Sequence, residues 1–170
     1  MTPEQRRYVF VRSAIGSANV NAVLNGAIGW GITTGLTVFP VWKIPGAAAD
    51  LVATAFGVAF GTCIGAGLKI RLDLTRGRIS PPVLTGRLAA FIARVPRHTF
   101  ARAVAFGLLG TSVFAPLALA GLAATGATAL DRVPFVAMKA GLSAFEGALM
   151  TPFILLAALA NVPGQNRPAL

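Results

Sequence analysis

The sequence predicts an all-α membrane protein with four transmembrane helices in one domain, residues 1–170. The chain is 55% hydrophobic and 12% charged, with a mean hydropathy of +0.73. An ordinary soluble domain has about twice that charged fraction. Four apolar stretches are each long enough to cross a hydrocarbon core of about 30 Å, and basic residues gather beside their ends. These observations together favour a bundle embedded in a bilayer.

The first predicted span covers about residues 16–39 and carries two asparagines, Asn21 and Asn25, four residues apart. Residues at this spacing share one face of a helix. Inside a bilayer, such amides either hydrogen-bond to another helix or line a wet cavity. We therefore expect Asn21 and Asn25 to contribute to helix packing, with a polar vestibule as the alternative.

The second predicted span covers about residues 45–68 and carries a stripe of small residues, Gly57, Gly61 and Gly65. Such a stripe lets the backbone of another helix approach closely. We expect helix packing along it. Asp50 lies near the outer start of this span, where the positive end of the helix dipole favours a carboxylate.

The connection 72–100 contains a short amphipathic pattern. Apolar side chains recur at Leu84, Leu88, Phe91, Ile92 and Val95, and the basic residues fall off that stripe. The pattern is typical of a helix that lies in the headgroup layer between the second and third spans. We expect the headgroups to contact Arg87, Arg94 and Arg97. A basic site for a soluble partner is the alternative interpretation.

The third and fourth spans are predicted at about residues 103–122 and 134–159. The fourth carries two ionisable residues, Lys139 near its outer end and Glu146 about 18 Å from Pro134. That places Glu146 near the centre of the hydrocarbon core. Charge at this depth is costly, so an intramembrane carboxyl group is by default a hypothesis for a functional site.

The orientation follows from the positions of the fifteen Lys and Arg residues. Lysine and arginine accumulate in cytoplasmic segments of membrane proteins. One side of the spans holds Arg6, Arg7, Arg12, Lys69, Arg71, Arg76, Arg78, Arg87, Arg94, Arg97, Arg102 and Arg167, and the other side holds Lys43, Arg132 and Lys139. We therefore expect both termini in the cytoplasm and an even number of spans.

Residues 134–151 align with residues 45–62, which indicates an internal repeat. The identities include Pro45 with Pro134, Phe56 with Phe145 and Thr62 with Thr151. Two hairpins that both enter from the cytoplasm would form a parallel repeat. Asp50 and Lys139 then occupy equivalent positions at equal depth, with opposite charges. If their helices pack along the glycine stripe, the two side chains can meet directly. Glu146 replaces Gly57, so only one copy carries the midplane carboxyl group.

The stretch KAGLSAFEGALMTPF resembles the second helix of a family of very small bacterial inner-membrane proteins that have two spans and no assigned function. The likeness covers about residues 134–155. The resemblance implies a location in a bacterial inner membrane and carries over no catalytic residue. Glu146 departs from the family pattern.

The remaining motifs exclude several classes of function. We find no nucleophile–base arrangement, no phosphate-binding glycine loop and no metal-ligand spacing, with one Cys63 and one His98 in the chain. We therefore expect no enzyme activity, cofactor or metal, and the placement of the positive charge beside apolar spans argues for anionic lipid rather than nucleic acid. Two hypotheses remain. The first is a structural or accessory protein that packs in a homo-oligomer or a larger membrane complex. The second is a small oligomeric transporter or channel in which Glu146 binds a proton or a cation.

Overall fold

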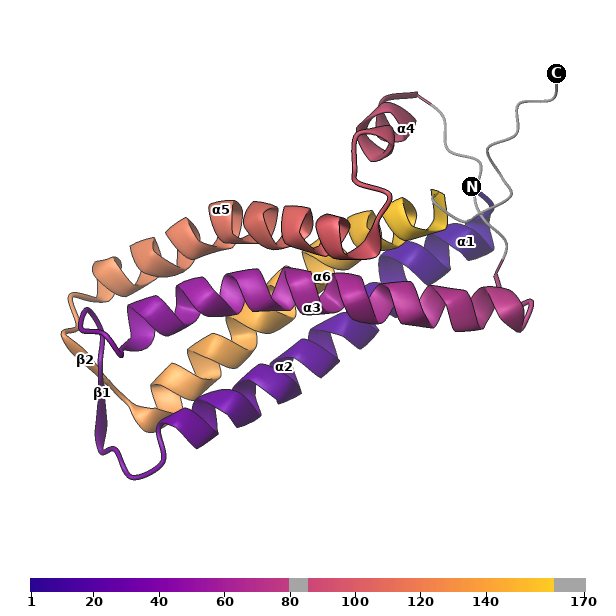
Figure 1. The fold of residues 1–170 in the computed structure, drawn as a ribbon. Coiled ribbons are helices and arrows are strands. Elements are labelled where there is room, and N and C mark those ends of the chain that lie inside the picture. Colours follow the sequence, from indigo (N-terminus) through magenta and orange to yellow (C-terminus); the bar gives the residue numbers. More distant parts are fainter. Residues whose placement is uncertain (80–85, 161–170) are drawn as a thin grey trace, which may run out of the picture.

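The structure, a computed structural model, describes residues 1–79 and 86–160 and contains a bundle of long helices (Figure 1). The long helices of this described part are α2 (Ser13–Ile32), α3 (Ala47–Thr75), α5 (Thr99–Thr125) and α6 (Arg132–Ala160). The short elements are α1 (Pro3–Arg7), the π-helical turn η1 (Tyr8–Arg12), α4 (Gly86–Ala93) and the strands β1 (Val38–Pro40) and β2 (Ala129–Asp131). The all-α expectation is confirmed.

Helix α6 is the central element of the bundle. It packs against α2, α3 and α5, and α3 also packs against α5. Residues 152–160 at its C-terminal end are all apolar, and residues 154–159 are all buried. A helix that is hydrophobic all round belongs in the interior. The polar side chains that α6 carries further toward its N-terminus are therefore placed inside the bundle.

The prediction of four transmembrane spans is wrong. Within the described residues, three helices are long and apolar enough to cross a membrane: Ala47–Thr75, Thr99–Thr125 and Arg132–Ala160. Helix α2 ends at Ile32, where the sequence predicted a span that continues to residue 39. Its asparagines reduce its apolar character. The backbone then turns at Gly35, with φ of +80°, a conformation that glycine adopts without steric cost.

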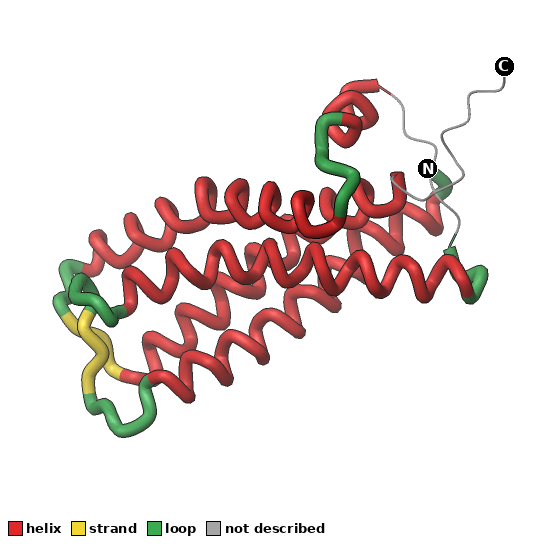
Figure 2. Tube along the Cα trace, viewed as in Figure 1, coloured by secondary structure: helices red, strands yellow, loops and turns green. Residues whose placement is uncertain are grey.

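A small strand pair closes one end of the bundle and was not predicted. β1 and β2 pair antiparallel, with Phe39 opposite Leu130, and the pair lies at the end of the molecule remote from α1 (Figure 2). The ring of Phe39 packs 4.7 Å from that of Phe135, between ring centroids. Both strands lie in loops between helices. The backbone N–H and C=O groups of one loop therefore find hydrogen-bond partners in the other loop.

The amphipathic pattern of the connection forms α4. Ile92 is buried against the main core, while Arg87 and Arg94 are exposed. Leu84, which the pattern included, lies outside the described residues. α3 extends to Thr75, beyond the predicted end at residue 68, and the tail after residue 160 is likewise outside the description. The duplication of a two-helix unit stays a prediction.

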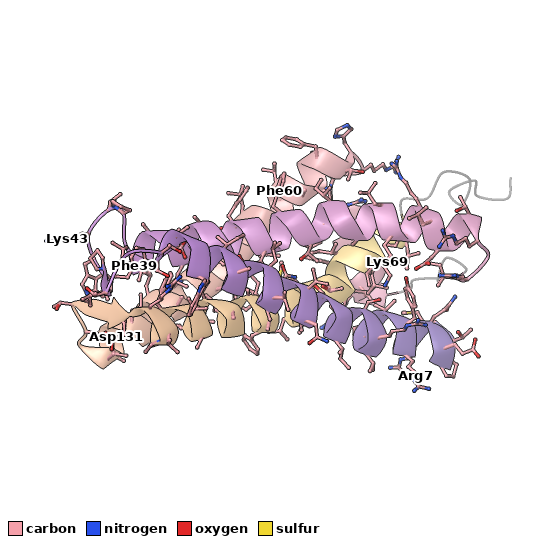
Figure 3. The ribbon with its side chains drawn as sticks, turned by 90° about the horizontal axis from the view of Figure 1, so that it is seen from below. Arg7, Phe39, Lys43, Phe60, Lys69 and Asp131 are labelled. Carbon is pink, nitrogen blue, oxygen red and sulfur yellow. The ribbon has the colours of Figure 1, made fainter. Side chains whose placement is uncertain are left out.

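The two ends of the bundle differ in charge. Arg7 and Lys69 lie at the end that holds α1, and Phe39, Lys43 and Asp131 lie at the strand-pair end (Figure 3). The α1 end also holds the C-terminus of α3 with Arg71, Arg76 and Arg78. We call it the basic end.

Candidate functional site

Glu146 lies fully inside the bundle and forms the centre of the candidate site. Its side chain has 0% exposure. Neither carboxyl oxygen, Oε1 nor Oε2, has a hydrogen-bond partner among the residues that the structure describes. A buried polar group without a partner carries an energetic cost of a few kcal/mol. Such a cost in the middle of a packed bundle points to a role beyond packing.

The space for the Glu146 carboxyl group exists because α5 has a glycine opposite it. A Cβ atom on Gly110 would lie 2.6 Å from Glu146 Oε1, 2.9 Å from Ala59 Cβ and 3.1 Å from the carbonyl oxygen of Ala55. The carboxyl group is therefore enclosed where α3, α5 and α6 meet. Nothing in the sequence links Gly110 to Glu146.

Glu146 belongs to a polar stripe on one face of α6. Lys139, Ser143 and Glu146 are four and three residues apart, so they lie on the same side of the helix, and all three are buried. Ser143 Oγ likewise has no hydrogen-bond partner within the described chain. The stripe leads from the strand-pair end of the bundle toward its middle.

Asp50 and Lys139 form an ion pair at the outer part of this stripe. Lys139 Nζ donates to Asp50 Oδ1 at 2.7 Å and to Oδ2 at 2.6 Å. The Lys139 side chain is 2% exposed and that of Asp50 20%. Lys139 therefore does not extend to the headgroups as an isolated lysine would. The pair joins α3 to α6 directly.

The stripe of Gly57, Gly61 and Gly65 does not form the contact that brings this pair together. A Cβ atom on any of the three would meet nothing within 4 Å, and all three face outward. The ion pair instead depends on the buried face of α3, which holds Leu51 and Ala55. The expected packing along the glycine stripe is thus not formed within the described chain.

Asn21 and Asn25 lie buried on α2, which packs against α6. Asn21 Nδ2 donates to the carbonyl oxygen of Ser17 at 2.9 Å, to Ser17 Oγ at 3.1 Å and to Thr62 Oγ1 at 3.2 Å. Asn25 Nδ2 donates to the Asn21 carbonyl oxygen at 3.1 Å. A Cβ atom on Gly147 would approach Asn21 Nδ2 to 2.7 Å. Asn21 thus connects α2 to α3 beside α6 and contributes to packing.

Arg102 is a buried charge, although in the sequence it stands among the basic residues that flank the spans. The residue is 4% exposed on α5, and its Nη1 donates to the carbonyl oxygen of Ala157 at 3.4 Å. Its Nε has no partner among described residues. The apolar run on both sides of Arg102 in FARAVAF is the signal that could have indicated burial. Arg87, Arg94 and Arg97 are exposed, by contrast.

No family model, no curated protein and no solved structure matches this chain. The function is therefore inferred from the geometry of the site alone. The site has one carboxyl group that is fully enclosed, a hydroxyl group one turn away and an ion pair further along the same helix face. Such groups accept and donate protons, and they lie within helices that can cross a membrane.

Proposed function

We propose that this protein carries protons across a membrane and that Glu146 is the group that binds and releases them. One observation supports the proposal above all others. The Glu146 carboxyl group is fully buried and has no hydrogen-bond partner within the described residues, in the middle of a candidate membrane-spanning helix. An intramembrane ionisable group is rare and usually marks a proton or ion pathway.

The surroundings of Glu146 favour the protonated form in this conformation. An ionised carboxylate without a cation or a hydrogen-bond donor is expensive in apolar surroundings. A Cβ atom on Gly110 would lie 2.6 Å from Glu146 Oε1, so the backbone of α5 at Gly110 lies close to the carboxyl group. Release of the proton therefore requires access of water or of another acceptor. A shift of α5 away from α6 at Gly110, where the α5 backbone lies close to the carboxyl group, would supply that access.

The same proposal includes the orientation of the bundle. The basic end, with Arg71, Arg76 and Arg78, faces the cytoplasm according to the accumulation of basic residues on that side of membranes. By the resemblance to small bacterial proteins, the membrane is a bacterial inner membrane. A reporter fused at residue 75 is expected to report a cytoplasmic location, and one fused at residue 43 the opposite side. The reverse pattern would overturn the orientation.

The test of the function is proton flux in liposomes that contain the purified protein. A pH difference across the bilayer is expected to decay faster with the wild-type protein than in empty liposomes. Glu146→Gln keeps the shape of the side chain but cannot ionise, so it should reduce the flux at least about tenfold. Glu4→Gln, at an exposed carboxylate, is the matched control and should keep the flux. Equal flux in the wild type and Glu146→Gln would overturn the proposal.

A labelling experiment separates a proton from a metal cation as the bound species. A hydrophobic carbodiimide reacts with a protonated carboxyl group, so it should modify Glu146 at neutral pH and less at high pH. Sodium or potassium ions at constant pH should not protect Glu146. Protection by one of these cations would assign the site to a cation instead of a proton.

A structural or accessory role is the second candidate, and the outward glycine stripe of α3 favours it. Gly57, Gly61 and Gly65 leave a shallow surface on which the helix of a second copy could pack closely. In mild detergent, the protein should then migrate as a symmetric oligomer, and Gly61→Leu should convert it to a smaller species. A single-copy particle that Gly61→Leu leaves unchanged would remove this candidate. A larger complex of fixed stoichiometry with another protein would support the accessory role.

A further inference from the structure

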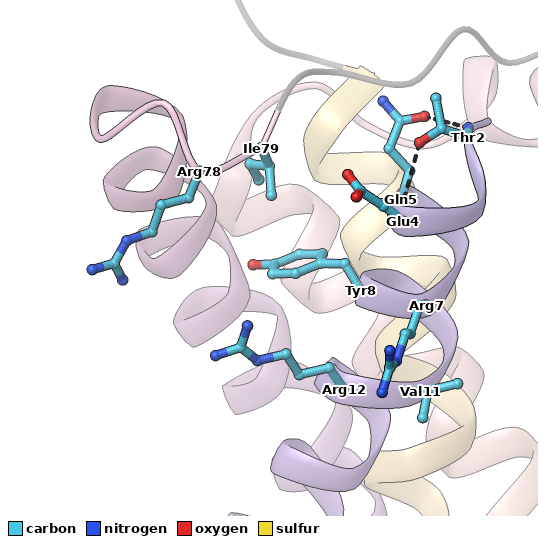
Figure 4. Close-up of a pocket in the computed structure, with 9 residues that line it drawn as sticks. All are labelled: Thr2, Glu4, Gln5, Arg7, Tyr8, Val11, Arg12, Arg78 and Ile79. Atoms are coloured by element: carbon cyan, nitrogen blue, oxygen red, sulfur yellow. Dashed lines mark hydrogen bonds between the residues drawn. The ribbon is translucent and has the colours of Figure 1, made fainter.

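A cleft at the basic end is lined by side chains that the proposed proton site does not use. Its volume is about 770 Å³, which is in the range of pockets that bind small ligands. Arg7, Arg12 and Arg78 line it together with Tyr8 and Glu4 (Figure 4). These residues come from the N-terminal segment and from the turn after α3, so two distant parts of the chain form the cleft.

Two of these arginines, Arg7 and Arg12, lie at the two ends of the π-helical turn η1. In this turn the N–H group of Ser13 donates to the carbonyl oxygen of Tyr8, five residues back. Arg7 and Arg12 are also five residues apart. In a π-helix, where each hydrogen bond spans five residues, this separation is close to one turn. Single π-helical turns inside α-helical segments are rare and are frequent at functional sites.

The third arginine lies near a hydrogen bond that joins the two segments. Tyr8 donates its hydroxyl proton to Asp73 Oδ2 at 2.6 Å, and Arg78 Nη1 lies 3.8 Å from Asp73 Oδ1. Figure 4 shows the guanidinium groups of Arg12 and Arg78 on the same side as the Tyr8 hydroxyl. The ammonium group of Lys69 lies 5.1 Å from the centre of the Tyr8 ring and adds positive charge nearby.

The positive charge of the cleft exceeds its negative charge. Glu4 is the carboxylate among the described lining residues and Asp73 lies beside Arg78, so two carboxylates stand against three arginines. Arg7 and Arg12 form no ion pair with the carboxylates that the structure describes. A guanidinium group presents a planar fork of N–H donors that matches the oxygens of a phosphate group, often with two parallel hydrogen bonds. Three such groups around one cleft are typical of phosphate recognition.

We propose that the cleft lined by Arg7, Arg12 and Arg78 binds a phosphate group, either that of an anionic lipid headgroup or that of a free anion. The cleft lies at the end where basic residues accumulate, and such segments lie next to anionic headgroups in the cytoplasmic leaflet. Arg87, Arg94 and Arg97, which the amphipathic pattern assigns to headgroups, do not line it. The proposed phosphate site is therefore separate from the general attraction between the arginines of the α4 region and anionic headgroups.

The test measures binding to the purified full chain in a neutral detergent at fixed ionic strength. The probes are inorganic phosphate, short-chain phosphatidylglycerol and, as a zwitterionic control, short-chain phosphatidylcholine, followed by calorimetry and by the shift of the unfolding temperature. We expect saturable binding of at least one of the first two probes. Saturation by phosphatidylglycerol alone identifies a headgroup, and saturation by inorganic phosphate identifies the phosphate group itself as sufficient.

Variants with equal charge loss separate the cleft from the surface. Arg7→Gln, Arg12→Gln and Arg78→Gln together should weaken binding at least about tenfold. The matched triple variant Arg6→Gln, Arg71→Gln and Arg76→Gln removes three arginines of the same end that do not line the cleft, and it should change binding less than about threefold. Arg12→Lys keeps the charge and the helix but loses the fork, so an intermediate affinity is expected. Equal weakening by both triple variants, or no saturable binding of either anionic probe, would overturn the proposal.

Discussion

The ammonium group of Lys139 on α6 lies 2.6 and 2.7 Å from the two carboxylate oxygens of Asp50 on α3. The Lys139 side chain is almost fully buried, whereas the Asp50 side chain is 20% exposed. Because the Lys139 ammonium group does not contact solvent, its charge is balanced by the Asp50 carboxylate. The pair therefore couples the positions of α3 and α6 toward the strand-pair end of the bundle.

Removal of one partner of this pair should destabilise the protein more than removal of both. Asp50→Ala or Lys139→Ala leaves a charge without compensation, and the free energy of unfolding in detergent should fall by about 3 kcal/mol. The double variant should lose clearly less, because no buried charge remains. The measurement is a double-mutant cycle by titration with a denaturing detergent.

The charge swap is the control for this cycle. Asp50→Lys combined with Lys139→Asp restores opposite charges and should recover much of the stability. Strictly additive effects of the single replacements would show that the two side chains do not interact in solution, against the distances in the structure.

Gly110 should not tolerate a side chain. Gly110→Ala places a Cβ atom against Glu146 Oε1, the Cβ of Ala59 and the carbonyl oxygen of Ala55. Overpacking of this kind costs about 1–3 kcal/mol. The proton flux should fall with it, because the added methyl group occupies space in which the Glu146 carboxyl group lies. The unfolding free energy and the flux are measured on the same preparation.

Gly61→Ala is the matched control for Gly110→Ala. Both replacements lie inside a long helix and gain the same helix propensity, up to about 1 kcal/mol. A Cβ atom on Gly61 meets nothing within 4 Å, so this variant should be neutral or slightly more stable. If the two variants behave alike, the close approach of α5 to Glu146 is not formed.

Asn21 should contribute more to stability than its neighbour Asn19. Asn21→Ala removes the donor that reaches Ser17 and Thr62, and the expected loss is about 1–2 kcal/mol. Asn19 is exposed, so Asn19→Ala should change the unfolding free energy by less than about 0.5 kcal/mol. A similar loss in both variants would assign the effect to helix propensity alone.

The long apolar helices could be predicted from the sequence because their signal is local. The fourth predicted span, 134–159, differs from α6 by one or two residues at its ends. The first predicted span continued to residue 39 because GWGITTGLTVF reads as one apolar run. The break after Ile32 depends on the turn at Gly35 and on the pairing of Phe39 with Leu130, a contact between residues far apart in the sequence.

The site was predictable in part for the same reason. Glu146 stands out in an apolar run, so composition and depth are sufficient to find it. Its enclosure by Gly110 could not be found, since the register between α5 and α6 is a property of tertiary packing. The outward position of Gly57, Gly61 and Gly65 has the same origin: a stripe of small residues permits close packing, but the buried face of α3 is set by Leu51, Ala55 and Ala59.

The pKa of Tyr8 provides a test of the basic end. Partial burial and the hydrogen bond to Asp73 raise this pKa from 10.0 to about 12. Because the folded state holds the phenol proton more tightly than the unfolded chain, the associated stability is fully present below pH 10. It is lost as the pH rises through about 12. Tyr8 is the one tyrosine of the sequence, so ultraviolet absorbance of tyrosinate reports its titration directly.

Two variants should move this titration in opposite directions. Asp73→Asn removes the acceptor charge that disfavours tyrosinate, so the midpoint should fall toward 10. Arg12→Gln removes a positive charge that lowers the Tyr8 pKa, so the midpoint should rise. The denatured chain, as the reference, should titrate near 10 in all cases. A midpoint near 10 in the folded wild-type protein would show that Tyr8 does not donate to Asp73, and the contact between η1 and the end of α3 would then be absent.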